Sequence, residues 1–217
     1  MPRLHVCFID DDDRFEIPLF TEVFGGRFDL VVGTSLTACS EVIAAKPGWL
    51  PDIFVLDLHY PFAEVDQKRV SLLAGQLLEL PPDGGSLRQA YLNVRAAEGR
   101  LQGLLQASGQ GPEGGLRLAA QVRTEFHGVP IVLYSRKATA EDYLRGVAQP
   151  GVVGMLFKPS GRNDEETTAL TSDRAPAIAA AIAGLMAANP GALSALKAAC
   201  SLVSWSLAEA RHHSAQS

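Results

Sequence analysis

Short apolar runs alternate with helix-like stretches along most of this chain. The apolar runs predict buried strands at residues 4–9, 28–32, 53–56, 131–134 and 155–157. Helical patterns lie between them at residues 15–24, 36–45, 116–126 and 139–147. Near-continuous apolar strands that alternate with helices are typical of a parallel sheet covered by helices on both faces. The pattern therefore predicts an α/β fold.

The alternation is interrupted after the third predicted strand. No strand pattern is found from about residue 62 to residue 111. One stripe of apolar residues at helical spacing runs over 70–80 and a second over 87–105, with the turn-forming sequence PPDGG between them. We interpret this segment as an inserted helical hairpin.

Three further patterns follow the fifth predicted strand. The polar residues 160–174 are predicted to form a loop, and the apolar spacing over 178–185 predicts a fifth core helix. A narrow apolar seam over 193–207 predicts an additional C-terminal helix. In a chain of 217 residues we therefore expect one domain over 1–190, interrupted at about 62–111, and a C-terminal helix and tail over 191–217.

Composition narrows the functional classes. The net charge of −5 leaves no basic footprint, which argues against nucleic-acid binding. The longest uncharged apolar stretch, at 175–188, is too short to span a membrane, and no secretory signal is evident. The three cysteines have no metal-ligand spacing and are interpreted as buried reduced thiols. We expect a cytoplasmic protein without a membrane or nucleic-acid partner.

Chemically active side chains follow four of the five predicted strands. Asp10 and Asp11 follow the first strand, Asp57 the third, Ser135 the fourth and Lys158 the fifth. Ligands of open α/β sheets bind outside the carboxyl ends of the strands, so we expect these side chains to converge there.

The converging set suits phosphoryl transfer. Clustered carboxylates need a cation, and Mg²⁺ takes oxygen ligands while it keeps several waters. Asp57 can act as a nucleophile, as carboxylates do in aspartyl-phosphate chemistry. The metal and Lys158 would neutralise the transferring phosphoryl group, and the hydroxyl of Ser135 could donate a hydrogen bond to it.

The sequence resembles the response-regulator receiver family of two-component signalling. FIDDD at the first strand, FVLDLHYP at the third, PIVLYS at the fourth and FKP at the fifth carry the resemblance, over about residues 3–61 and 112–188. It implies a flavodoxin-like five-stranded parallel sheet of order 2-1-3-4-5. It also implies Mg²⁺ dependence and phosphotransfer to Asp57 from a sensor histidine kinase or a phosphotransfer protein.

The resemblance also assigns roles to single residues. It makes Asp10, Asp11 and Asp57 metal ligands, together with the backbone carbonyl of His59. The side chain of His59 is itself expected to be a solvent-exposed loop histidine. Ser135 matches the switch hydroxyl of the family.

Three features depart from the family pattern. Besides the insertion, Arg136 follows Ser135 where a small residue is usual, and Met155 stands three residues before Lys158, where an aromatic residue is common. We expect the guanidinium of Arg136 to shield the acyl phosphate on Asp57 and slow its hydrolysis.

Two alternatives stay open at this point. A haloacid-dehalogenase-like phosphatase would use Asp10 as nucleophile and Asp12 as acid/base, but it leaves Asp57 unexplained. A degenerate receiver would act only as a binding scaffold. For a working receiver we expect output through protein contacts, with a homodimer through the inserted hairpin or the C-terminal helix left open.

Overall fold

Five parallel strands form the centre of the molecule. The computed structural model describes residues 3–64, 66–78 and 87–188, so the turn at 81–85 and the C-terminal segment predicted over 191–217 lie outside the described residues. The strands form one sheet in the order β2-β1-β3-β4-β5, as predicted. Their bounds are β1 His5–Ile9, β2 Asp29–Gly33, β3 Ile53–Asp57, β4 Ile131–Ser135 and β5 Val152–Phe157.

The register brings the strand ends to one edge. Ile9 at the end of β1 pairs with Leu56, and Asp57 at the end of β3 pairs with Tyr134. Strand β4 ends at Ser135, opposite the last residue of β5. The residues that follow the strands are therefore neighbours in space although up to about 150 positions separate them in the chain.

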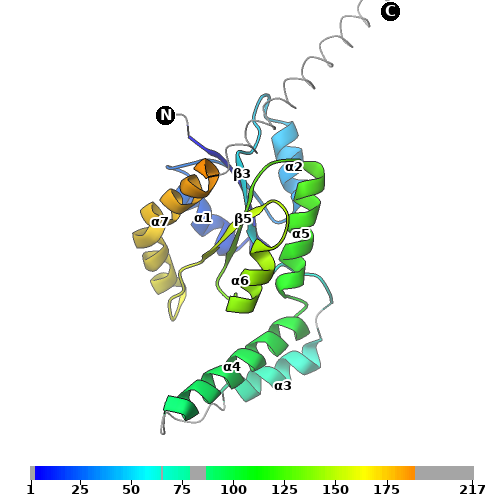
Figure 1. Ribbon diagram of the computed structural model, residues 1–217, viewed down its shortest axis with the longest axis vertical. Coiled ribbons are helices and arrows are strands. Elements are labelled where there is room, and N and C mark those ends of the chain that lie inside the picture. Colours follow the sequence, from blue (N-terminus) through cyan, green and yellow to red (C-terminus); the bar gives the residue numbers. More distant parts are fainter. Residues whose placement is uncertain (1–2, 65, 79–86, 189–217) are drawn as a thin grey trace, which may run out of the picture.

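Helices cover both faces of the sheet (Figure 1). Helices α1 and α7 lie on one face, α2 and α5 on the other, and α6 packs along β5. Their bounds are α1 Glu16–Phe24, α2 Leu36–Ala44, α5 Pro112–Glu125, α6 Ala140–Val147 and α7 Asp164–Ala187. Each face has its own apolar core, the first centred on Phe8 and Phe20 and the second on Phe54 and Leu56. Burial on both faces explains why the strands are almost continuously apolar.

Helix α7 corrects the prediction of a loop over 160–174. The helix begins at Asp164, where Asn163 caps it by accepting a hydrogen bond from the amide of Glu166 at 2.9 Å. Three acidic residues fill the first turn and interact favourably with the helix dipole. The inward face of this first part carries Thr167 and Thr171, which are buried. The prediction failed because it relied on apolar spacing, whereas the buried positions in this part of the helix are threonines.

The predicted hairpin is present as helices α3 Gln67–Leu78 and α4 Leu87–Ala107. The two helices pack together and project from the end of the sheet (Figure 1). The segment returns to the sheet through an isolated bridge between Pro61 and Gln110. Gly109 has a φ of +72°, and a Cβ there would lie 2.1 Å from the carbonyl oxygen of Ala63, so only glycine suits this close return.

Two findings concern the predictions made from composition. None of the helices in the described part of the chain combines the length and apolar character needed to cross a membrane. Cys7 and Cys39 are buried free thiols, as predicted, whereas Cys200 lies outside the described residues.

Candidate functional site

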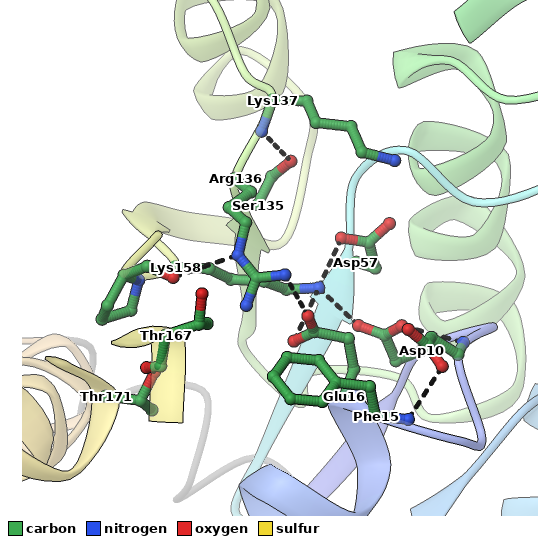
Figure 2. Close-up of polar contacts among 12 residues, drawn as sticks. Asp10, Phe15, Glu16, Asp57, Ser135, Arg136, Lys137, Lys158, Thr167 and Thr171 are labelled. Carbon is green, nitrogen blue, oxygen red and sulfur yellow. Dashed lines mark hydrogen bonds and ion pairs between the residues drawn. The ribbon is translucent and has the colours of Figure 1, made fainter. Parts of the chain in front are cut away.

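The side chains predicted to converge do so at the carboxyl edge of the sheet. Asp10, Asp57, Ser135 and Lys158 all have exposed fractions of 7% or less. They lie side by side (Figure 2) and line a cavity of about 130 Å³. The other residues that line this cavity are Asp11, Asp12, Glu16, Gln110, Arg136 and Lys137.

Lys158 connects the ends of two strands. Its Nζ donates to Oδ2 of Asp10 at 2.5 Å and to Oδ1 of Asp57 at 2.8 Å, and Oε2 of Glu16 lies 3.7 Å away. Burial alone would lower the pKa of Lys158, but the carboxylates of Asp57, Asp10 and Glu16 outweigh burial and raise it above the ordinary lysine value. The ammonium is therefore charged at physiological pH.

The carboxylates are crowded in spite of this cation. Burial raises the pKa of Asp10 to about 6; the charge of Asp57 also raises it, whereas Lys158 lowers it. Burial, followed by the charge of Asp57, also raises the pKa of Asp11. In both groups the main cause is the removal of the carboxylate from water, and the charge of Asp57 adds to it.

This donor set fits Mg²⁺. In the described part of the chain, no group of three or more Asp, Glu, His or Cys side chains is placed so that it could hold a metal ion by itself. Mg²⁺ does not need such a group, because it usually binds through one or two carboxylates and completes its shell with waters. Asp10, Asp11 and Asp57 offer hard oxygen ligands around a cavity with surplus negative charge. The role of the His59 carbonyl stays a prediction.

His59 lies differently from the prediction. Its side chain is only 1% exposed, so the expectation of a solvent-exposed loop histidine is wrong. Nδ1 shares a hydrogen bond of 2.9 Å with Oγ of Ser135, and burial lowers the pKa of the imidazole. The amide of Gly115 at the start of α5 donates to the carbonyl of Leu58, which closes this loop over the histidine. The neutral ring thus holds the predicted switch hydroxyl.

Arg136 lies at the rim of the cavity. Its Nη1 donates to Oε1 of Glu16, and its Nε donates to the carbonyl oxygen of Pro159 at 3.0 Å. The guanidinium also lies over the ring of Phe15, 5.8 Å from its centre. The side chain is held close to the site, as shielding would require, but by a glutamate that the sequence did not single out.

The side chain of Asp12 bonds to the backbone just before α1 begins. Its Oδ1 accepts hydrogen bonds from the backbone amides of Arg14 at 3.0 Å and Phe15 at 2.9 Å. Such contacts of an aspartate with the amides two and three residues later are typical of a turn. The side chain that the phosphatase alternative requires as an acid/base is therefore engaged with the backbone.

Three residues around the cavity were missed from the sequence: Glu16, Gln110 and Lys137. Glu16 is the first residue of α1 and is 7% exposed. An acidic residue at this position is usually explained by its favourable interaction with the helix dipole, so the sequence offered no sign of a further role. Gln110 belongs to the inserted segment, and nothing in its sequence context marks it. Met155 is 6% exposed in the core of β5, so it contributes packing there rather than a cavity-lining side chain.

Comparisons with known proteins bear on the fold. No protein-family model matches the chain, and no curated protein matches it. Among solved structures, it is similar to a signal receiver domain of a Bacteroides fragilis response regulator, with 14% identity, a TM-score of 0.41, and coverage of 79% of this chain and 97% of that one.

Two other solved receiver domains are similar. For that of an HD domain-containing protein from Pseudomonas fluorescens Pf-5, identity is 10%, the TM-score is 0.42, and 85% of this chain and 94% of that chain are covered. For the receiver domain of Nitrogen Regulatory Protein C, identity is 18% and the TM-score is 0.37, and 81% of this chain and 95% of that chain are covered. By its own strand order, this chain has the flavodoxin-like five-stranded parallel sheet predicted from the receiver resemblance, with additional helices.

Proposed function

We propose that this protein is a phosphorylation-operated signalling switch that accepts a phosphoryl group on Asp57 from a sensor histidine kinase or a phosphotransfer protein. The observation that carries the proposal is the position of Lys158, whose ammonium contacts the carboxylates of both Asp10 and Asp57. A buried cation beside a buried carboxylate nucleophile is suited to a reaction that builds negative charge at that carboxylate.

The chemistry assigned to this site is a simple displacement. A carboxylate oxygen of Asp57 attacks phosphorus, an acyl phosphate bond forms, and the bond from phosphorus to the donor nitrogen breaks, leaving its electron pair on the donor imidazole. Lys158 balances part of the negative charge on the phosphoryl oxygens. Mg²⁺ would be held by Asp10, Asp11, Asp57 and the carbonyl of His59, and when bound it supplies further charge neutralisation.

Ser135 is assigned the response to phosphorylation. Its hydroxyl is shared with His59 and also accepts from the amide of Lys137 at 3.3 Å. A phosphoryl group on Asp57 would offer a charged acceptor, and hydrogen bonds to charged groups are stronger than neutral ones. The hydroxyl would then donate to the phosphoryl group, and the contact with His59 would be lost.

The output proposed is protein contact by a cytoplasmic protein, without nucleic acid or membrane. Exposed apolar side chains on the hairpin support this; Leu72, Tyr91 and Val94 are each more than half exposed. A homodimer could form through this hairpin or through the C-terminal segment, 191–217.

The proposal is tested by incubating the protein with a small phosphodonor and Mg²⁺, followed by intact-mass measurement. Wild type should gain one phosphoryl group, Asp57→Asn none, and Asp13→Asn, which alters an exposed acid of the same edge, should react as wild type does. Absence of phosphate on wild type, or its presence on Asp57→Asn, would contradict the assignment. Turnover of a generic phosphate ester would favour the phosphatase instead.

A further inference from the structure

One side chain of the inserted segment reaches into the candidate site. Gln110 lies three residues beyond the end of α4, yet it lines the same cavity as Asp10, Asp57 and Lys158. The insertion therefore contributes directly to the site rather than only projecting from the sheet.

Both ends of the Gln110 amide are bonded to charged groups. Nε2 donates to Oδ2 of Asp11 at 3.0 Å, and Oε1 accepts from Nζ of Lys137 at 3.1 Å. The orientation of the amide is fixed by charge, because a flipped amide would place its oxygen against the Asp11 carboxylate. Asp11 is thus held by a donor that comes from another part of the chain.

The backbone around Gln110 is tied to both ends of the hairpin. Its amide donates to the carbonyl of Leu105 in the last turns of α4 at 2.8 Å, and its bridge to Pro61 joins it to the strand-end loop. Beside it, the amide of Phe62 donates to Gly109 and the amide of Asp66 to Ala107, at 2.8 and 2.7 Å. A movement of the hairpin base would displace the glutamine side chain.

We propose that Gln110 is a positioning residue through which the inserted hairpin controls Mg²⁺ binding, by fixing the carboxylate of Asp11. This inference rests on the metal site of the proposed function. Hydrogen bonds from outside the ligand shell orient the ligands, and their loss typically weakens metal binding by 10- to 100-fold. Coupling of this kind is reciprocal, so bound Mg²⁺ also stabilises the base of the hairpin.

The first test is titration of Mg²⁺ by calorimetry into the full-length, unphosphorylated protein at constant ionic strength. Gln110→Ala and the similarly long Gln110→Met should each bind Mg²⁺ about tenfold more weakly than wild type. Gln106→Ala, a change of an exposed glutamine one turn earlier, is the matched control and should bind as wild type does. Recovery of wild-type affinity in Gln110→Met would assign the side chain a space-filling role and overturn the proposal.

A double-mutant cycle tests the route through Asp11. If Gln110 acts by fixing that carboxylate, Gln110→Ala should weaken binding no further in a protein that already carries Asp11→Ala. An undiminished additional loss would overturn the proposed route. In parallel, Mg²⁺ should slow amide hydrogen exchange at Phe62 and Asp66 in wild type, and much less in Gln110→Met.

The outcomes separate this inference from the proposed function. If wild type binds no Mg²⁺, the metal site of the proposed function is wrong. If wild type binds Mg²⁺ and both Gln110 variants bind within about twofold of it, well below the expected loss, only the role of Gln110 is wrong.

Discussion

At the scale of single residues, the site is a balance of buried charges. Lys158 is paired with Asp10 and Asp57, while Arg136 is paired with Glu16 at the rim. Removing one partner of such a group leaves a buried charge without compensation, which is costly even where the intact pair contributes little stability. The charges are therefore best explained by chemistry at the site rather than by stability.

The burial of Asp10, together with the charge of Asp57, predicts a particular dependence of stability on pH. The pKa of Asp10 is raised from 3.8 in the unfolded chain to about 6, so between these values the folded protein binds more protons than the unfolded one. Its free energy of unfolding should therefore fall as the pH rises through this window, by on the order of 2–3 kcal/mol from this residue. In Asp10→Asn this contribution should be absent.

The measurement is chemical denaturation of both proteins between pH 4 and pH 7 in a chelator. The stability of Asp10→Asn relative to wild type should increase up to about pH 6 and then level off. Asp13→Asn, in an exposed position, serves as the control and should show no such change. A difference between wild type and Asp10→Asn that is constant with pH would contradict the prediction.

Arg136 permits a second prediction at this scale. Its guanidinium is held at the cavity by Glu16 and by the carbonyl of Pro159. We expect it to exclude water from the acyl phosphate, so the phosphorylated half-life of Arg136→Ala should be shorter than that of wild type. Arg162→Ala, which removes an exposed pair with Glu166, is the matched control. An unchanged or longer half-life for Arg136→Ala would contradict the proposed shielding by Arg136.

At the scale of elements, the approach of α5 to the end of β3 shapes the site. A Cβ on Gly115 would lie 2.4 Å from the carbonyl oxygen of Leu58, and one on Gly114 would lie 1.8 Å from that of Tyr60. Only glycine allows the first turn of α5 to come this close. The contact fixes the backbone at Leu58, next to His59, whose ring bonds to Ser135.

Two glycine substitutions of opposite sign test this packing. Gly115→Ala forces backbone against backbone and should lower the free energy of unfolding by more than about 2 kcal/mol. Gly99→Ala, in the exposed middle of α4 with no atom within 4 Å of the added Cβ, should raise it by up to about 1 kcal/mol. Thermal or urea unfolding measures both. Equal changes in the free energy of unfolding would show that the effect at Gly115 comes from helix propensity rather than from close packing.

At the scale of the whole molecule, the hairpin of α3 and α4 is an addition to the alternating strands and helices of the α/β fold. It extends beyond the sheet (Figure 1) and carries exposed apolar residues, while its base contacts Asp11 of the candidate site through Gln110. Phosphorylation adds about −1.5 to −2 charge at that base. We therefore propose that a change in hairpin packing transmits the state of the site to a partner surface.

We expect phosphorylation to change association of the protein and to produce no DNA binding. Light scattering should show a larger mass after phosphorylation, and a gel shift at physiological salt should show no complex. The double variant Tyr91→Ser, Val94→Ser should stay at the smaller mass, whereas Leu144→Ser on α6 serves as an exposed apolar control. Association that survives the hairpin variant would place the contact elsewhere. Tight DNA binding would contradict the predicted output.

The sheet and the set of residues at its carboxyl edge could be predicted from the amino-acid sequence. Apolar runs and helical spacing are local signals, and the ends of parallel strands meet by geometry, so the neighbourhood of Asp10, Asp57, Ser135 and Lys158 followed from chain order alone. The hairpin was predictable for the same reason, because its two stripes have helical period.

The other side chains that meet this edge could be identified only from the folded chain. The buried ring of His59 meets Ser135 from the end of another strand, and Gln110 is brought to the site where the hairpin returns to Pro61. Glu16 reaches Arg136 and Lys158 from the first residue of α1, although both partners lie more than 100 positions away in the chain. Contacts between distant segments leave no periodic pattern in the sequence, so only the packing of the folded chain determines which side chains surround Asp57.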